Sequence, residues 1–208
     1  MSMIHNYARI PSDALQEIIK DTNKIFPVFF PKNWEEVLIQ VERTRKQSLR
    51  YKILSSFKED KETNTKIDSI KQFERKLEGR IFHMDVYKAW HGIHFLLTGL
   101  VWGTGETALG NVIMGGESIG PDLGYGPARY LTPDEVKQCS EALKDISIEE
   151  LRSRFNQNVE NIEAADLYPF SDRVTQEDLD FILDNFAPLK QIYEDTANAG
   201  DSMILYMM

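Results

Sequence analysis

Two histidines lie three residues apart in the segment DVYKAWHGIHFLLTG, residues 85–99, directly after a tryptophan. On a helix, His91 and His94 would occupy adjoining turns, where two imidazoles can bind one metal ion and an acidic residue such as Asp85 can add a third ligand. The pattern lacks the glutamate that makes H-E-x-x-H informative, so we expect no metal. We expect His94 to be a hydrogen-bonded histidine on the apolar face that it shares with Trp90.

Carboxylates downstream of this helix could supply acid–base chemistry. Glu117 and Asp122 lie in the glycine-rich segment that follows, and either could act together with His94. Such a pair would suit a hydrolase, and His91 would allow a metal-assisted version of the reaction. Hydrolysis by His94 with a nearby carboxylate is therefore the alternative function, and the sequence does not decide whether the protein is an enzyme.

Glycine is concentrated in one stretch of the chain. Ten of the twelve glycines fall between Gly92 and Gly126, and no lysine or arginine occurs between Lys88 and Arg129. Residues 103–108, GTGETA, match the pattern G-x-G-x-x-A, but no strand–turn–helix pattern surrounds them, so we expect no dinucleotide there. Because the stretch has no cation, it is also poorly suited to phosphate groups. We therefore expect no cofactor.

The same stretch is well suited to binding. Glycine permits positive φ angles and the close approach of a partner, and the stretch ends with Tyr125 and Arg129. We expect the aromatic helix, the glycine-rich loop and residues 125–129 to form one concave surface. A binding or protein-interaction domain is thus the favoured function, with another protein as the partner. The residues of this candidate surface are Trp90, His91, His94, Glu117, Asp122, Tyr125 and Arg129.

The composition is that of a globular protein with an acidic balance. The 208 residues carry a formal charge of −9, and 42% of them are hydrophobic. This charge disfavours nucleic acid as a general partner. The distribution is uneven, because residues 42–80 hold 12 basic and 7 acidic side chains, whereas residues 132–208 hold 6 basic and 17 acidic. Only the basic arm, residues 42–80, would support nucleic-acid binding.

Cysteine content and hydropathy indicate the compartment. The single cysteine, Cys139, excludes an internal disulfide and is typical of a reducing compartment. Residues 1–13 lack the basic and apolar regions of a signal peptide. The uncharged stretch 89–105 is too short and too rich in glycine to span a membrane. We expect a cytoplasmic protein with no membrane partner, in which Cys139 is a small buried residue.

Capping signals locate the helices that must position the candidate surface. Helix starts are indicated by Ser12, by the capping boxes that begin at Thr132 and Ser147, and by Thr175, whose helix is predicted to run to about Ala199.

The middle of the chain is also predicted to be helical. Helical spacing of apolar residues begins near Asn33, with a break near residues 61–65 and a second helix over 67–77. Asp85 is expected to cap a helix over residues 86–97.

Short apolar segments predict the strands. They cover residues 3–10, 111–114, 128–131 and 203–207. Because these segments do not alternate regularly with single helices, an α+β fold suits the chain better than a doubly wound sheet. We predict a mostly helical single domain over residues 1–208, with a small, mainly antiparallel sheet and a basic helical excursion at about 33–80.

Several motifs together resemble the YfbM-like family of small bacterial proteins, whose function is unknown. They are DVYKAWHGIHFLLTG, NVIMGGESIG, DLGYGPARYLTPDEV, DLYP and the opening M-I-x-x-Y-A-R-I. The resemblance is weakest over residues 24–79. It implies a compact α+β domain of unassigned role, and it draws attention to the Trp90–His94 helix, the Gly115-Gly116 pair and residues 124–129. It implies no catalytic residues, and compact members lack a histidine at the place of His91.

Overall fold

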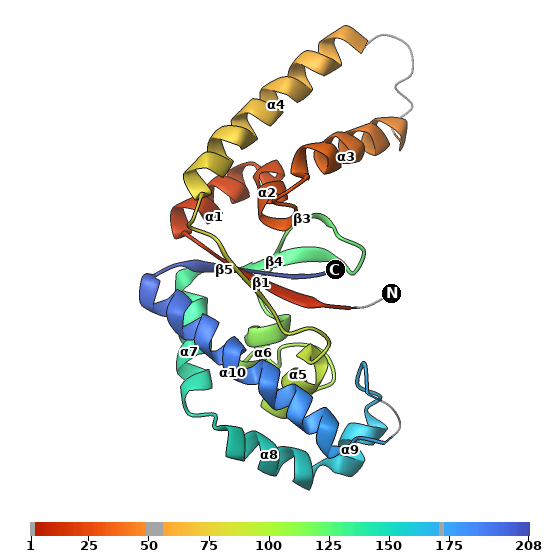
Figure 1. Cartoon of the computed structure of the whole chain (residues 1–208), viewed down its shortest axis with the longest axis vertical. Helices are drawn as coiled ribbons and strands as arrows, with labels where there is room; N and C mark the ends of the chain where they lie inside the picture. The colour runs from red at the N-terminus through yellow and green to blue at the C-terminus, as the bar shows by residue number, and fades with distance from the viewer. Residues whose placement is uncertain (1–2, 49–55, 171–172) are drawn as a thin grey trace. The chain divides into compact units, whose positions relative to one another are not determined.

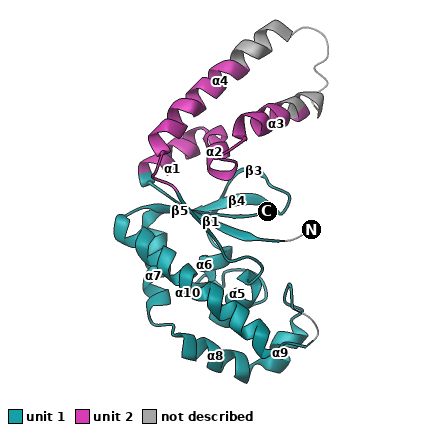
Figure 2. Cartoon of the chain, in the orientation of Figure 1, with its two compact units in different colours: residues 1–12, 82–208 teal, residues 13–81 magenta. Residues whose placement is uncertain are grey.

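The computed structural model describes residues 3–48, 56–170 and 173–208. The chain packs into two compact units, which Figure 2 shows in different colours. The first unit comprises residues 1–12 and 82–208, and the second comprises residues 13–81. The basic helical excursion predicted at about 33–80 falls within the second unit.

A five-stranded sheet forms the frame of the first unit (Figure 1). In sheet order its strands are β2 (Phe82–Asp85), β1 (His5–Ile10), β5 (Ser202–Met207), β4 (Pro127–Leu131) and β3 (Glu117–Asp122), and every neighbouring pair is antiparallel. Directly opposed residues of antiparallel strands point to the same face. One row of side chains therefore crosses the sheet on a single face, through Ser118, Arg129, Leu205, Tyr7 and Met84.

Helices of the first unit lie on one side of this sheet (Figure 1). They are α5 (Trp90–Thr98), α6 (Ala108–Met114), α7 (Pro133–Lys144), α8 (Ile148–Gln157), α9 (Val159–Ala164) and α10 (Gln176–Ala199). The apolar sides of these helices share one core with sheet residues such as Tyr7 and Leu205. The helices thereby fix the backbone around the candidate surface.

The second unit is helical. Its elements are α1 (Ser12–Lys20), a 3₁₀ helix (Thr22–Ile25), α2 (Phe26–Phe29), α3 (Trp34–Ser48) and α4 (Ser56–Leu77). A small core of Phe26, Trp34, Leu38, Ile67 and Ile70 holds α2, α3 and α4 together. Much of the predicted basic arm, including Arg50 and the side chains of residues 45–62, lies outside the described part of the chain.

The helix predicted over residues 86–97 begins later, at Trp90. Asp85 ends β2 instead of capping a helix, and its carboxylate accepts a hydrogen bond from the Tyr87 backbone N–H at 3.0 Å. The backbone of residues 86 and 87 continues to pair with His5, over 3.1 and 3.2 Å. These two bonds and the left-handed turn at Tyr87, where φ is 46°, keep residues 86–89 out of the helix, which the local sequence does not reveal.

Two further predictions were wrong. Residues 111–114, predicted as a strand because they form a short apolar segment, make up the second half of α6. This helix starts where the Thr107 hydroxyl accepts a hydrogen bond from the Gly110 backbone N–H at 3.1 Å. The break predicted near residues 61–65 is absent, since α4 continues through it. Strands β2 and β3 had no counterpart among the predicted elements.

Other expectations are confirmed. The capping box predicted at Thr132 is present, and Thr175 starts the last helix, there also with a capping box. Ser147 caps α8 by accepting from the Glu150 backbone N–H, but the return bond of the predicted box is absent from the described contacts. Strands β1, β4 and β5 lie where strands were predicted, Cys139 is fully buried, and the fold is α+β and mostly helical. Among the residues that the structure describes, no helix combines the length and the apolar character needed to cross a bilayer.

Candidate functional site

The candidate residues separate into three places. Tyr125 and Arg129 line one open cavity of about 260 Å³, whose wall also contains Trp102. Trp90, His91 and His94 are buried within the first unit and do not line that cavity. Glu117 and Asp122 are exposed on β3. The expected single concave surface therefore contains only part of the predicted set.

The cavity lies where the ends of three strands meet the loop that follows α5. Its lining residues are Trp102, Met114, Ser118, Tyr125, Gly126, Pro127, Arg129, Leu205, Tyr206 and Met207. Trp102 leaves 63% of its surface exposed and Tyr125 leaves 36% exposed. Exposed aromatic side chains beside a hollow are typical of binding sites, because they offer large contact areas to a partner.

Arg129 reaches the cavity from β4 while holding the end of a helix. Its Nη2 donates to the Ile113 carbonyl at 3.0 Å, and its Nη1 donates to the Met114 carbonyl. A cation at a helix C-terminus interacts favourably with the helix dipole, by about 0.3–1 kcal/mol. Burial lowers the pKa of Arg129, but an arginine stays charged at neutral pH. The guanidinium is thus a fixed positive charge at the cavity wall.

Four side chains converge on the last carbonyls of α6. Besides Arg129, the hydroxyls of Tyr7 and Tyr193 donate to the Val112 carbonyl at 3.3 and 2.8 Å. The Nε2 of His5 lies 3.0 Å from the Ile113 carbonyl, and a hydrogen bond there requires the proton on Nε2. These bonds satisfy carbonyls that a helix end leaves unpaired. They also give Arg129 a structural role independent of any ligand.

Arg154 also binds the carbonyls at the end of a helix, but unlike Arg129 it has a carboxylate partner. Arg154 donates to the Leu96 and Leu97 carbonyls at the end of α5, over 2.9 and 3.3 Å, and it also pairs with the carboxylate of Glu150. Arg129 has no carboxylate partner among the described residues. Among the described residues, its hydrogen-bond acceptors are the Ile113 and Met114 carbonyls.

His91 is held by the backbone on both sides of its ring. The Tyr168 backbone N–H donates to Nδ1 at 3.1 Å, so the proton lies on Nε2, which donates to the Val101 carbonyl at 2.9 Å. Burial lowers the pKa of His91. With both ring nitrogens occupied, His91 is a neutral structural residue that ties the loop carrying Trp102 to α5.

His94 is fully buried, and neither ring nitrogen has a hydrogen-bond partner among the residues that the structure covers. The expected hydrogen bond is therefore not among its close contacts, although the Gly103 backbone acts on its ring. Burial lowers the pKa of His94 to about 4, and the neighbouring His91 and Arg129 act in the same direction, while the backbone of Gly103 opposes them. The ring is thus neutral at physiological pH.

The two carboxylates have structural partners of their own. Glu117 accepts a hydrogen bond from the Tyr130 hydroxyl at 2.5 Å, and the two residues are opposed in the sheet. Because Ser118 is opposed to Arg129, the alternation of side chains places Glu117 on the other face of the sheet from Arg129. Asp122 accepts from the Gly124 and Gly126 backbone N–H groups at 2.7 and 3.0 Å, which shapes the β3–β4 turn.

In the described ranges, no three histidine, cysteine or acidic side chains lie close enough together to bind a metal ion. Trp90 is likewise structural, since its Nε1 donates to the Met3 carbonyl at 3.2 Å. Glu117 and Asp122 bond to other groups, and both ring nitrogens of His91 are occupied, so the contacts of the described residues give the hydrolase hypothesis no support. What the site offers is a hollow, aromatic surface and one fixed cation.

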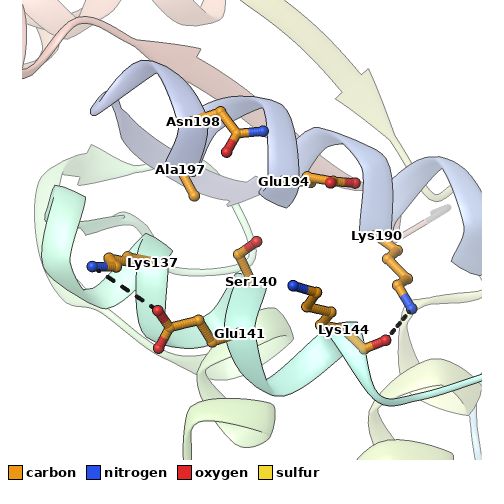
Figure 3. A pocket seen from close by; sticks show the side chains of 8 residues that line it. All are labelled: Lys137, Ser140, Glu141, Lys144, Lys190, Glu194, Ala197 and Asn198. Carbon is orange, nitrogen blue, oxygen red and sulfur yellow. Dashed lines mark hydrogen bonds and ion pairs between the residues drawn. The ribbon is translucent and has the colours of Figure 1, made fainter.

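Other hollows have a different character. One of about 220 Å³ lies between α7 and α10, and Figure 3 shows its side chains. There Lys190 donates to the Lys144 carbonyl at 2.8 Å, and Lys137 lies 4.0 Å from Glu141. The lining is polar and mixed in charge, with no aromatic side chain. A wider hollow of about 570 Å³ borders the end of α5, where Arg154 is paired with Glu150.

Trp102, Met114 and Tyr206 were not among the predicted site residues. The aromatic identity of Trp102 inside a glycine-rich loop was the one available signal. The residue before it, Val101, is held by the His91–Val101 bond, which no local pattern indicates. Tyr206 joins the cavity because β5 lies beside β4, a pairing between segments far apart in the chain.

A family model and a solved structure each match almost the whole chain. A family model described as "Domain of unknown function (DUF1877)" matches residues 1–206. The crystal structure of YfbM from Escherichia coli, described as a protein of unknown function, superposes with a TM-score of 0.60 at 17% sequence identity. The match covers 99% of this chain and 100% of that one. Comparison with curated proteins gives no match.

Proposed function

Because the chain belongs to the DUF1877 family, a domain of unknown function, we propose its role from the site itself: it is a binding domain that contacts another protein through the cavity beside Arg129. Membership agrees with the resemblance to YfbM-like proteins. The observation that carries the proposal is the exposure of Trp102 at the rim of a hollow that also contains Tyr125 and an arginine without a carboxylate partner in the described chain.

The cavity suits binding better than catalysis. Its lining combines aromatic and aliphatic side chains with few polar groups, which favours recognition through buried apolar area. The aromatic residues at its rim belong to the types that dominate binding energy at protein interfaces. The volume of about 260 Å³ is below the roughly 300–1,000 Å³ of drug-sized ligand pockets, and it fits a single side chain of a partner.

We place this function in the cytoplasm. The only cysteine, Cys139, is buried as a free thiol, and burial raises its pKa to about 12. A protein with one inert thiol and no disulfide is typical of a reducing compartment. Nucleic acid is disfavoured as the partner at the cavity, because the described lining offers a single cation and the chain carries a net charge of −9.

Quantitative partner recovery tests the proposal. Tagged protein and its Trp102→Ala and Tyr125→Ala variants would be used to recover partners from the native cell, with Phe82→Ala as the matched control, because Phe82 is a 52%-exposed aromatic residue outside the cavity. We expect each cavity variant to lose at least about 80% of a specifically recovered protein, since truncating an interface aromatic often costs 1–2 kcal/mol or more. Equal recovery by all variants would refute a binding role for this cavity.

A further inference from the structure

The guanidinium of Arg129, which has no carboxylate partner among the described residues, indicates the kind of ligand that binds in the cavity. We infer that the cavity binds the free C-terminal carboxylate of a partner protein whose last residue is apolar. The inference rests on the proposed binding function and makes it specific. Two N–H groups of Arg129 donate to the Ile113 and Met114 carbonyls, whereas a guanidinium has five N–H donors. The others have no partner in the described residues and belong to a side chain that lines the cavity.

A single carboxylate matches this charge better than a phosphate does. The planar fork of arginine pairs with a carboxylate through parallel hydrogen bonds. A phosphate monoester carries nearly two charges at neutral pH. The cavity wall supplies one cation, the segment from residue 89 to residue 128 contains no lysine or arginine, and the net charge is −9. An anion with one charge is therefore the one that this site can neutralise.

A hydroxyl faces the same space from the neighbouring strand. Ser118 is directly opposed to Arg129, so both side chains project from the same face of the sheet, and both line the cavity. Ser118 is exposed, and its hydroxyl can donate a second hydrogen bond to an anion held by Arg129. The arrangement thus offers a charged and a neutral donor on adjacent strands.

The rest of the lining explains why the carboxylate should belong to an apolar residue. Met114, Leu205 and Met207 lie beside the guanidinium, and Trp102 and Tyr125 are exposed at the same hollow. In the last residue of a protein, the carboxylate and the side chain are both bonded to the same Cα atom. One apolar terminal residue can therefore meet Arg129 and the aliphatic wall together within about 260 Å³.

A matched pair of probes tests the inference on the full chain without mutation. N-acetylleucine carries the carboxylate, and N-acetylleucine amide has the same shape without the charge. Binding would be followed by the fluorescence and indole N–H resonance of Trp102, because Trp34 and Trp90 are buried and 3% or less exposed. We expect the carboxylate to bind about ten-fold to a hundred-fold more tightly than the amide, the range for charge-assisted hydrogen bonds.

Variants locate the effect. Arg129→Gln is expected to abolish the preference for the carboxylate, and Ser118→Ala to weaken carboxylate binding a few-fold, whereas Arg152→Gln, which removes an exposed arginine paired with Asp180 outside the cavity, should change nothing. Circular dichroism and the melting temperature check that Arg129→Gln is folded. If it is not, Ser118→Ala and the comparison of the two probes still decide the question.

The outcomes separate this inference from the function on which it rests. Equal binding of the two probes, or an unchanged preference in Arg129→Gln, would overturn the carboxylate while leaving a binding cavity. No response to either probe at millimolar concentrations would also overturn it. If partner recovery is in addition unaffected by Trp102→Ala and Tyr125→Ala, the proposed function fails as well.

Discussion

The imidazole ring of His91 lies flat against the indole of Trp90, with the ring centroids 4.5 Å apart and the planes 9° from parallel. This contact fixes the plane of the imidazole and so aims its two nitrogens at backbone groups from different segments, the Val101 carbonyl and the Tyr168 N–H. The pair therefore joins α5 to the loop that carries Trp102 and to the segment that follows α9.

Replacing His91 by phenylalanine should separate stacking from hydrogen bonding. His91→Phe keeps an aromatic ring against Trp90 but leaves a carbonyl and an N–H group without partners, at a cost of about 1–3 kcal/mol for each group that stays buried. Urea unfolding measures the loss. The matched control is His83→Phe at an exposed histidine of β2, where we expect a change within about 0.5 kcal/mol. Equal effects of the two substitutions would contradict the tethering role of His91.

The buried histidines should make the protein less stable in acid. Burial is the main cause that lowers the pKa of His5 to about 3 and that of His94 to about 4, against an ordinary value of 6.5. Between the lowered pKa of each buried histidine and the ordinary value of 6.5, the unfolded chain binds more protons than the folded chain, so the free energy of unfolding rises with pH. The free energy of unfolding therefore reaches its full value above about pH 6.5 and decreases as the pH falls toward 4 and then 3. Urea midpoints measured from pH 7.5 to 4.5 test this.

His94→Leu provides the sharper form of that experiment. Since neither ring nitrogen of His94 has a partner within the described chain, replacing it by an apolar side chain removes two unsatisfied polar atoms. We expect the free energy of unfolding at pH 7 to change by less than about 1 kcal/mol, or to increase. The dependence on pH below 6.5 should become shallower. A loss of several kcal/mol at pH 7 would instead indicate that His94 has a necessary polar role.

A close approach of backbone makes Gly110 difficult to replace. A Cβ atom at Gly110 would lie 1.8 Å from the Thr104 carbonyl oxygen, which leaves no room for alanine. We expect Gly110→Ala to cost about 3 kcal/mol or more, because backbone must shift. Gly200→Ala is the control, because Gly200 has φ +66° with nothing within 4 Å of a Cβ and should cost only about 1 kcal/mol. A smaller loss for Gly110→Ala than for Gly200→Ala would contradict this packing.

The parts of the fold that depend on neighbouring residues could be predicted from the sequence. Thr132 and Thr175 cap their helices through bonds to residues three positions later, and both were recognised. The later start of α5 could not be seen, because residues 86 and 87 form hydrogen bonds with His5, some 80 residues away, and Tyr87 takes a left-handed turn conformation with φ 46°. Residues 111–114 were misread because the Thr107 cap, outside the apolar run, decides their conformation.

The same distinction explains the candidate site. Tyr125 and Arg129 were identified because they lie close together at the end of the glycine-rich stretch, and both line the cavity. Glu117 lies just as near in sequence, but the register that opposes it to Tyr130 sends its side chain to the other face of the sheet. A shift of one residue in that register would have reversed the outcome. Register is a property of the assembled sheet, so spacing could not supply it.

The central place of β5 also governs how the sheet can assemble. Among the strands that the structure describes, β1 with β2 and β3 with β4 can pair as soon as their own segments are available, yet the two pairs do not touch each other in the sheet order. They are joined only when β5, the last of the five along the chain, inserts between β1 and β4. Contacts across such long sequence separations slow folding. Since Leu205, Tyr206 and Met207 belong to β5, the cavity wall is complete only when β5 has joined the sheet, and binding at the cavity requires the closed sheet.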